Sequence, residues 1–375
     1  MNVLEKEQSG LNTDLGSQCS RIAYSYAKKT FSNRTNLVGN LIQTVDGGYS
    51  SQLDVLGARI GISSDGIGTK VEIAERVQKY NTLGFDLIAM TIDDLICNGF
   101  EPAFLSNILD VDKLDDKIVD SLMNGLQQAA DYSNIVITGG EIAELGSRIG
   151  GYGDRMHFNW CATGIGVLHT SLAAPITGQN IAEGDSIITL YNPGFRSNGF
   201  SLVRKILFRK YGENWHEKKT DGLSAAWGET ALTPCLIYSP VITKLLESGV
   251  ALNGIAHITG GGVVDNLGRL LKVNKFGADL HSLFEPEDYY NELISLGDVS
   301  LHKAYQYWNM NNGMMIVLNE SEAVKALAIL SKETRYKAQA AGIVTKEQVI
   351  RIDLGKMDST PRNSRELEYK SYHNK

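Results

Sequence analysis

The chain has 375 residues, of which 43% are hydrophobic and 21% are charged, and its formal net charge is −7. This length predicts two domains, and the composition is that of an ordinary soluble globular protein. The acidic balance argues against nucleic acid as a partner, and no apolar run approaches the roughly 20 residues that a membrane span requires.

The cysteines and the N-terminus indicate a cytoplasmic protein. Cys19, Cys97, Cys161 and Cys235 lie far apart in the sequence and form no CxxC pair. This spacing favours reduced thiols over a disulfide framework or a zinc site. The first residues, MNVLEKEQSGLNTD, are polar and acidic, unlike a signal peptide.

The first half of the chain alternates predicted strands and helices. The first thirty or so residues are polar, with a helix candidate at 18–31, and we interpret 1–35 as an N-terminal arm. The half ends in a predicted inter-domain linker at 170–185, where Pro, Gly and polar residues show no period. Strands are predicted at 58–64, 103–111, 134–141 and 157–170, and helices at 83–99 and 114–132.

The second half has the same mixed pattern. Strands are predicted at 186–192, 255–262 and 313–319, and helices at 197–212, 235–249, 263–272, 298–307 and 320–333. We therefore predict an α/β (α+β) fold with one domain at 36–170 and another at 171–350. The remaining residues, 351–375, are charged and nearly free of aliphatic side chains, which predicts a mobile tail.

The stretch DGIGTK, residues 65–70, follows the first predicted strand. Gly66 and Gly68, next to Thr69, leave backbone N–H groups open to an anion. Lys70 is able to reach a phosphate, and Asp65 is able to hold a magnesium ion that bridges phosphates. The combination indicates a Mg–nucleotide site, although it is neither a P-loop nor a GxGxxG motif. The alternative is a glycine turn with a solvated lysine.

Three aspartates interrupt the apolar helix predicted at 83–99. Asp86 and Asp93 are seven residues apart, about two turns, so they share one face, and Asp94 lies about 100° round the helix. Buried carboxylates need a partner or a metal ion. We therefore favour a functional role for these acids over a salt bridge at the wet edge of the helix.

Three further loops place glycine beside polar residues. The pattern GGE at 139–141 follows a predicted strand, and the glycines 260–262 precede a predicted helix, whose N-terminus favours phosphate. His257 stands just before those glycines, and Arg196 stands before a Ser-Asn pair that reads as a helix N-cap. A turn, a core histidine and a capped helix are the alternatives. No GxSxG or HExxH motif is present. The several loops that combine acidic residues with glycines therefore indicate phosphate chemistry with a hard cation such as Mg²⁺.

Taken in order, six blocks resemble the motifs of phosphoribosylformylglycinamidine cyclo-ligases, also called aminoimidazole ribonucleotide synthetases. They are SSDGIGTK, GFDLIAMTIDDLICNGFEP, GGEIAE, SNGFSLVRK, AHITGGG and WNMNNGMM, and the resemblance spans roughly residues 58–350. It implies two α/β domains, with strands of the N-terminal domain forming a barrel across a homodimer. It also implies ring closure of formylglycinamidine ribonucleotide with ATP, which gives aminoimidazole ribonucleotide, ADP and phosphate.

The resemblance also implies roles for the residues singled out above. Mg²⁺ would be bound by Asp65 and Asp94, with Asp46 as a further candidate, and the catalytic residues would be His257, Lys70 and Asp94. ATP or its phosphates would contact Gly66, Gly68, Thr69, Lys70, Gly139, Gly140, Glu141, Gly260 and Gly261, and the ribonucleotide would contact Arg196, Ser197 and Asn198.

The chain departs from the usual motifs of this family at several positions. Asp93 stands where Asn is usual, Arg196 stands where His is usual, and QTVDGGYSS at 43–51 replaces a glycine-rich loop. These changes leave two alternatives open: a superfamily enzyme of the small-molecule kinase type, or a nucleotide-binding paralogue without catalysis. A selenophosphate synthetase is disfavoured because no cysteine lies between residues 20 and 96 to serve as its reactive group.

Overall fold

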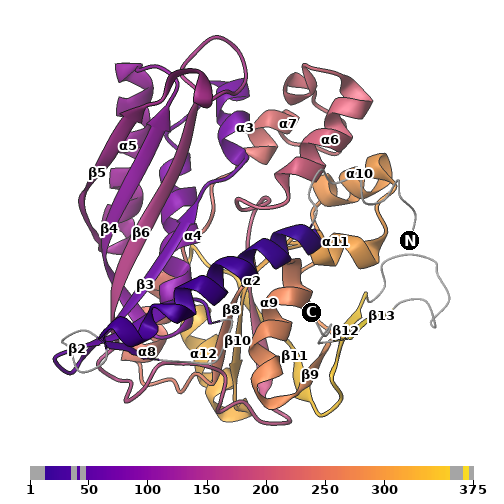
Figure 1. Cartoon of the computed structure of the whole chain (residues 1–375). Helices are drawn as coiled ribbons and strands as arrows, with labels where there is room; N and C mark the ends of the chain where they lie inside the picture. Colours follow the sequence, from indigo (N-terminus) through magenta and orange to yellow (C-terminus); the bar gives the residue numbers. More distant parts are fainter. Residues whose placement is uncertain (1–12, 35–39, 43–47, 355–365, 371–375) are drawn as a thin grey trace.

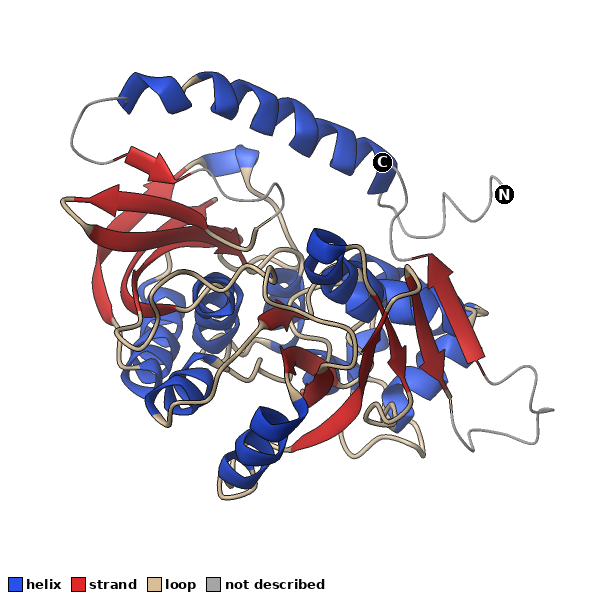
Figure 2. Cartoon of the chain, turned by 90° about the horizontal axis from the view of Figure 1, so that it is seen from below, coloured by secondary structure: helices blue, strands red, loops and turns tan. Residues whose placement is uncertain are grey.

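Two β-sheets, one in each half of the chain, organise the fold (Figure 1, Figure 2). The structure is a computed structural model that describes residues 13–34, 40–42, 48–354 and 366–370. Within these ranges no helix combines the length and the apolar character needed to cross a membrane. The first sheet takes its strands from residues 40–168, and the second takes its strands from residues 186–370.

The first half forms a six-stranded sheet with the order β1-β2-β3-β6-β4-β5, in which β4 and β5 run parallel. Helices α4 and α5 pack on one face of this sheet (Figure 1). The elements are α2 (Thr13–Lys29), η1 (Phe31–Arg34), β1 (Asn40–Ile42), β2 (Ser51–Val55), β3 (Ala58–Gly66), α3 (Lys70–Val77), α4 (Leu83–Cys97), β4 (Phe100–Val111), α5 (Asp116–Ser133), β5 (Val136–Glu144), η2 (Gly146–Arg148) and β6 (Phe158–Leu168).

Local sequence explains the two covering helices. Helix α4 is apolar around almost its whole circumference, which is typical of a helix enclosed on all sides. The Asp115 side chain caps α5 by accepting hydrogen bonds from the backbone N–H groups of Lys117 and Ile118. Asn134 ends α5 in a left-handed conformation with φ of 54°. The helices predicted at 83–99 and 114–132 are confirmed, the candidate at 18–31 overlaps α2, and α3 was not predicted.

The second half forms a seven-stranded sheet with the order β13-β12-β9-β11-β7-β10-β8. Every residue of β10 is buried, so this strand lies in the core. The elements are β7 (Ser186–Tyr191), α6 (Phe200–Tyr211), η3 (Trp215–Glu217), α7 (Trp227–Ala231), α8 (Ser239–Glu247), β8 (Gly254–His257), α9 (Gly262–Leu271), η4 (Lys272–Asn274), β9 (Gly277–Leu280), α10 (Asp288–Gly297), α11 (Leu301–Tyr307), β10 (Asn312–Leu318), α12 (Glu320–Leu330), β11 (Ala338–Thr345), β12 (Val349–Asp353) and β13 (Glu366–Lys370).

One hydrophobic core crosses from the first half to the second. Ile67 and Leu87 from the first half belong to the same buried cluster as Phe200 and Trp227 from the second half. Burial of these side chains removes apolar surface of both halves from water at once. The shared core therefore fixes the relative position of the residues that each half contributes to the site.

The structure differs from the sequence prediction in part of the second half. The helix predicted at 235–249 begins at Ser239, because the backbone N–H groups of Cys235 and Tyr238 are directed to carboxylates on α4. Helix α10 and strand β11 are absent from the prediction. The small and polar residues of β11, AQAAGIVT, do not alternate with large apolar ones, whereas Tyr289, Tyr290 and Leu293 of α10 follow a helical spacing that the prediction overlooked.

The segment expected to be a charged tail contributes to the second sheet. Strand β13 pairs antiparallel with β12, and the register places Tyr369 opposite Ile350. Tyr369 is 3% exposed, and its hydroxyl donates a hydrogen bond to the carbonyl of His302 at 2.8 Å. The expectation of a mobile tail over 351–375 is therefore wrong for residues 351–353, which belong to β12, and for Glu366–Lys370. Five residues of alternating charge and apolar character give too short a pattern to predict a strand.

Replacing Tyr369 with alanine should detach β13 from the sheet. Truncation of a large buried aromatic costs about 3–5 kcal/mol, and release of a terminal strand limits the loss to the free energy of its local opening. We expect faster amide hydrogen exchange in Val349–Asp353 and a lower urea midpoint. Lys370→Ala changes an exposed residue of the same strand and should leave exchange in β12 unaltered. Equal exchange in both variants would contradict the importance of Tyr369.

Candidate functional site

The aspartate of the first glycine motif lies near the end of β3 and lines a surface groove. Asp65 is partly buried, and its Oδ1 accepts a hydrogen bond from the backbone N–H of Gly66 at 2.7 Å. Ser64 and Ser106 line the same groove. Burial raises the pKa of Asp65 to about 6, and the negative charge of Asp94 adds to this rise. The Asp65 carboxylate is therefore exposed to the charge of Asp94.

Asp94 faces His257 across the boundary between the two halves. His257 is the last residue of β8, and its Nδ1 lies 2.7 Å from Asp94 Oδ1. The His257 side chain is fully buried, whereas 23% of the Asp94 side chain is exposed. Burial raises the pKa of Asp94 to about 7, and burial together with the charge of Arg196 lowers the pKa of His257 to about 3. A neutral His257 thus contacts the Asp94 carboxylate from the buried side.

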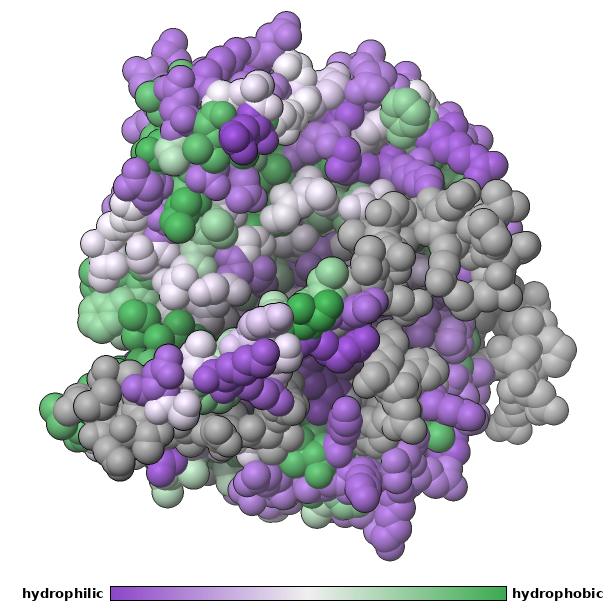
Figure 3. All heavy atoms as spheres, viewed as in Figure 1, coloured by the Kyte–Doolittle hydropathy of each residue, from purple (hydrophilic) through white to green (hydrophobic). Residues whose placement is uncertain are grey.

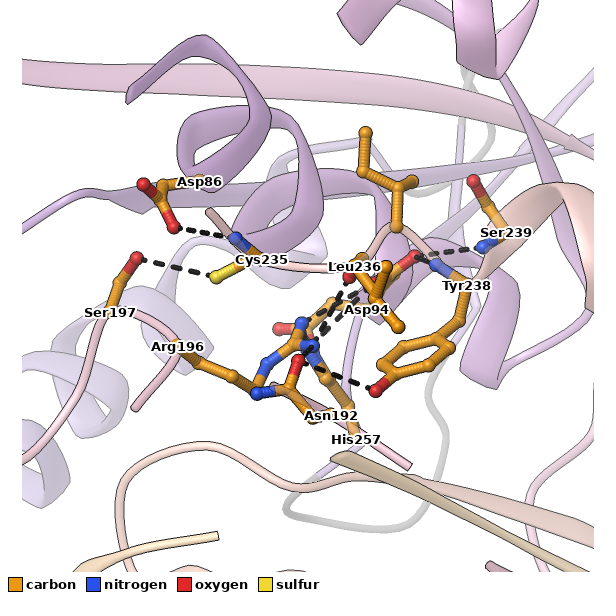
Figure 4. Close-up of polar contacts among 12 residues, drawn as sticks. Asp86, Asp94, Asn192, Arg196, Ser197, Cys235, Leu236, Tyr238, Ser239 and His257 are labelled. Carbon is orange, nitrogen blue, oxygen red and sulfur yellow. Dashed lines mark hydrogen bonds and ion pairs between the residues drawn. The ribbon is translucent and has the colours of Figure 1, made fainter. Parts of the chain in front are cut away.

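Arg196 is enclosed among polar groups from both halves (Figure 4). Its Nη2 lies 3.3 Å from Asp93 Oδ2 and 2.5 Å from His257 Nε2. Its Nη1 donates hydrogen bonds to Asn192 Oδ1 and to the carbonyl of Leu236, at 3.3 and 3.2 Å. Arg196 is 0% exposed. The substrate contact that the resemblance implied for Arg196 is therefore not supported, because the side chain reaches no open surface.

Lys70 is also buried in an ion pair. Its Nζ lies 2.7 Å from Asp86 Oδ1, with both side chains 0% exposed, and it donates a hydrogen bond to the carbonyl of Thr233 at 2.6 Å. Asp86 Oδ1 also accepts a hydrogen bond from the backbone N–H of Cys235 at 3.0 Å. A phosphate contact would require Lys70 to leave these partners. In this arrangement Lys70 instead connects the first half to the segment 233–239 of the second.

The acids of α4 therefore divide into two kinds. Asp86 and Asp93 lie on the shared face predicted from their spacing, and each is fully buried against a cationic side chain. They form salt bridges, as the alternative interpretation held, but in the interior and not at a wet edge. Asp94 alone retains exposed surface, and it is therefore the acid of α4 that is open to a ligand.

The glycine and Ser-Asn loops, predicted separately, lie close together. A Cβ added to Gly68 would lie 3.9 Å from the carbonyl oxygen of Ser197, and one added to Gly260 would lie 3.5 Å from Asn198 Nδ2. Gly261, with φ of 93°, is the N-cap of α9 and makes no side-chain capping bond, so the first backbone N–H groups of α9 lie next to these loops. The Oδ1 of Asn198 is buried without a hydrogen-bond partner among the described residues. Such an orphaned acceptor fits a site that a ligand completes.

The expected helix caps differ from those observed. The N-cap of α6 is Gly199, without a side-chain hydrogen bond, so the capping role expected for Ser197 and Asn198 is wrong. Thr69 is the N-cap of α3 and likewise makes no capping bond through its side chain. Thr69 is an exposed residue.

The GGE motif lies on the edge strand β5, separated from Asp65 on β3 by the two strands β6 and β4. Gly139, Gly140 and Glu141 are exposed residues of β5. Glu141 pairs with Ile108 of β4, and Ile108 lines the groove that contains Asp65. This motif therefore borders the groove without entering the Asp94–His257 cluster.

Sequence reasoning missed Arg269, a cation of α9. Its positive charge is the largest influence that opposes the raised pKa of Asp94. Its guanidinium carbon lies 5.0 Å from the ring centroid of Tyr49, whose hydroxyl donates a hydrogen bond to the carbonyl of Asn266. The available signal was spacing: Arg269 follows the glycines at 260–262 by about two helical turns, so it lies along the same helix as the phosphate-binding candidates.

The described residues fit a magnesium ion that arrives with a nucleotide. Within the described ranges no group of three or more His, Cys, Asp or Glu residues is arranged to hold a metal ion. Mg²⁺ is usually bound by one or two carboxylates, together with waters and substrate phosphates. Asp65 and Asp94 meet that requirement. Asp46, the further candidate ligand, lies outside the described residues.

Comparison with known proteins defines the class to which the fold belongs. Residues 53–167 match the family described as AIR synthase related protein, N-terminal domain, and residues 182–355 match its C-terminal domain. A chain in the crystal structure of a HypE–HypF complex shares the fold with a TM-score of 0.59 at 18% identity, covering 82% of this chain and 90% of that chain. HypE in complex with ATP gives a TM-score of 0.55 at 16% identity, covering 81% and 84%. The protein is thus of the AIR synthase class.

Closer relatives narrow this class to one family. The phosphoribosylformylglycinamidine cyclo-ligase of Pyrococcus horikoshii is 34% identical over 345 residues, which cover 92% of this chain and 96% of the relative. The enzyme of the same name from Thermococcus kodakarensis is 34% identical over 352 residues, covering 94% and 98%. The chain belongs to the phosphoribosylformylglycinamidine cyclo-ligase family. The family and the two-domain α/β fold class predicted from the motifs are confirmed, and the barrel across a homodimer stays a prediction.

Proposed function

We propose that this protein converts formylglycinamidine ribonucleotide and ATP to aminoimidazole ribonucleotide, ADP and phosphate, a step of purine biosynthesis. The observation that carries this proposal is family membership over nearly the whole chain, at 34% identity across 92% of its length. The proposal includes a ribonucleotide as the small-molecule substrate, Mg²⁺ bound with ATP, and the cytoplasm as the place of action.

The reaction requires activation of a poor leaving group. The formyl oxygen attacks the terminal phosphorus of ATP and releases ADP, after which the amidine-derived nitrogen attacks the formyl carbon and expels phosphate. The protein needs mainly to position the reactants and to stabilise charge on the moving phosphoryl group. When bound, Mg²⁺ would neutralise part of that charge.

The site residues have separate tasks in this reaction. Asp65 and Asp94 would hold the metal ion, one from the end of β3 and one from α4. The glycine loops at 66–68 and 260–262 would present backbone N–H groups to phosphate oxygens. Asn198 lies beside the second of these loops, and its Oδ1 has no hydrogen-bond donor among the described residues. This free acceptor supports a substrate contact at Asn198. His257 contacts Asp94 and not solvent, so we assign it the task of holding Asp94.

The protein acts, in this proposal, as a homodimer joined through the first sheet. The face of that sheet opposite α4 and α5 carries exposed apolar side chains, and Figure 3 shows hydrophobic residues over β4, β5 and β6. A contiguous apolar face of this kind is typical of an interface. The members with the largest exposed fractions are Phe104, Ile108, Val136, Ile165 and Val167, at 43%, 48%, 57%, 36% and 45%.

A charge on this face should separate the subunits. Ile165→Lys places an ammonium opposite Phe104 and Ile62 in the apolar face, and its desolvation in an interface would cost several kcal/mol. We expect the mass measured by light scattering to fall from that of a dimer to that of a monomer. Val324→Lys is the matched control, because Val324 is 68% exposed on α12, outside this sheet. A monomeric wild-type protein would contradict the dimer proposal.

Complementation tests the proposed function directly. The gene should restore growth without purines to a strain that lacks its cyclo-ligase. The purified protein should release ADP and phosphate in a reaction that depends on formylglycinamidine ribonucleotide and Mg²⁺. ATP binding without such turnover would favour the non-catalytic paralogue, and transfer of phosphate to a stable product would favour a kinase.

A further inference from the structure

A buried charge network connects Asp93 and Arg196 with His257 and Asp94. We call Asp93, Asp94, Arg196 and His257 the Arg196 cluster. Asp93 comes from α4, His257 from β8, and Arg196 from the loop before α6. The side chains of Asp93, Arg196 and His257 are each 0% exposed, so their contacts are protected from water.

The geometry assigns the proton on His257. The Nη2 of Arg196 lies 2.5 Å from His257 Nε2, and a guanidinium has only N–H donors. His257 Nε2 must therefore be the acceptor and carry no proton. In a neutral imidazole the proton is then on Nδ1, which lies 2.7 Å from Asp94 Oδ1 and donates to it. This bond engages one oxygen of Asp94 and leaves the other for the site.

Asp93 is the counter-ion that allows an arginine at this depth. Its Oδ1 accepts hydrogen bonds from the backbone N–H groups of Tyr238 and Ser239, both at 2.9 Å. Its Oδ2 faces Arg196 at 3.3 Å. Either charge alone would be buried without a partner, which is strongly destabilising, whereas the pair is neutral. The charges of Asp93 and Arg196 therefore compensate each other.

The backbone conformation of Arg196 also indicates that surrounding contacts hold this residue in place. Its φ is 59°, in the left-handed region that residues other than glycine rarely adopt. Such a conformation costs of order 1–3 kcal/mol and persists where surrounding contacts determine it. The four polar contacts of the guanidinium are contacts of that kind.

We propose that Arg196 is a positioning residue: with Asp93 as its counter-ion it fixes the Nδ1–H tautomer of His257, and through that ring it orients the Asp94 carboxylate. The tautomer part stands on geometry alone. The consequence for metal binding rests on the proposed function, in which Asp94 is a ligand of Mg²⁺. Removing a group that orients a metal ligand typically costs 10–100-fold in metal affinity or activity.

Nitrogen NMR of the full-length protein tests the tautomer. The chain has seven histidines, and His257→Gln identifies the signals of His257. In the wild type, long-range ¹H–¹⁵N spectra should show Nδ1 protonated and Nε2 unprotonated. In Arg196→Met and in Asp93→Asn/Arg196→Met, this pattern should change to a mixture with the Nε2–H form. The double variant removes both charges, so it keeps the test available if the single variant does not fold.

A control and a second measurement complete the test. Arg204→Met removes an arginine of α6 outside the cluster and should leave the His257 signals unchanged. Titration of Mg²⁺ in the presence of a non-hydrolysable ATP analogue should show about 10-fold weaker binding in the double variant. An unchanged tautomer in both Arg196 variants would overturn the proposal, as would a changed tautomer with wild-type Mg²⁺ affinity. Failure of the wild type to convert formylglycinamidine ribonucleotide would reject the proposed function and leave the NMR result intact.

Discussion

Asp94→Asn should reduce cyclo-ligase turnover by about 100-fold or more and leave the fold unchanged. Loss of a metal ligand removes several kcal/mol of charge stabilisation from phosphoryl transfer, and each 1.36 kcal/mol is a factor of ten in rate. The amide oxygen of asparagine still accepts the hydrogen bond from His257 Nδ1, so the thermal midpoint should stay close to that of the wild type. The measurement is kcat/KM for ADP release at saturating Mg²⁺.

The matched control for this prediction is Asp120→Asn, which makes the same change on the exposed side of α5. It should retain full activity. His257→Ala in the same assay should also lose activity, because Asp94 then loses its hydrogen-bond donor. Normal growth of the purine auxotroph with Asp94→Asn would show that this carboxylate is not a metal ligand.

Lys70→Met should destabilise the protein by about 3–5 kcal/mol, which is the usual cost of leaving one partner of a buried ion pair without its counter-charge. The uncompensated group is Asp86, whose side chain is fully buried. The connection from Lys70 to the carbonyl of Thr233 is lost as well. Urea unfolding at fixed protein concentration measures this effect, because the stability of an oligomer depends on concentration.

A second variant separates a structural role of Lys70 from the phosphate contact that the motif predicted. Lys70→Met/Asp86→Asn removes both charges and should recover part of the lost stability, since the remaining amide still accepts a hydrogen bond from the backbone N–H of Cys235. If Lys70→Met instead kept wild-type stability and raised only the KM for ATP, the lysine would contact phosphate during turnover.

Regular elements with long patterns could be predicted from the sequence, whereas short ones could not. Helices α4 and α5 span 15 and 18 residues, enough for an apolar period to emerge, and α5 carries its own capping aspartate. Strand β13 has five residues, and its identity as a strand depends on hydrogen bonds to β12. The start of α8 likewise depends on Asp86 and Asp93, which belong to a distant part of the chain.

The sequence alone is sufficient to assign the family, the fold class and the motif residues, because each motif is a local run of residues and six runs in order are specific. It also determined that Asp86 and Asp93 share a face, since helical spacing requires only local geometry. Which acid of α4 is open to a ligand depends on tertiary packing. Asp93 is neutralised by Arg196, 103 residues away, while Asp94, its direct neighbour, keeps an exposed edge. Such pairings follow from the packing of the two halves around a shared core, which no local pattern contains.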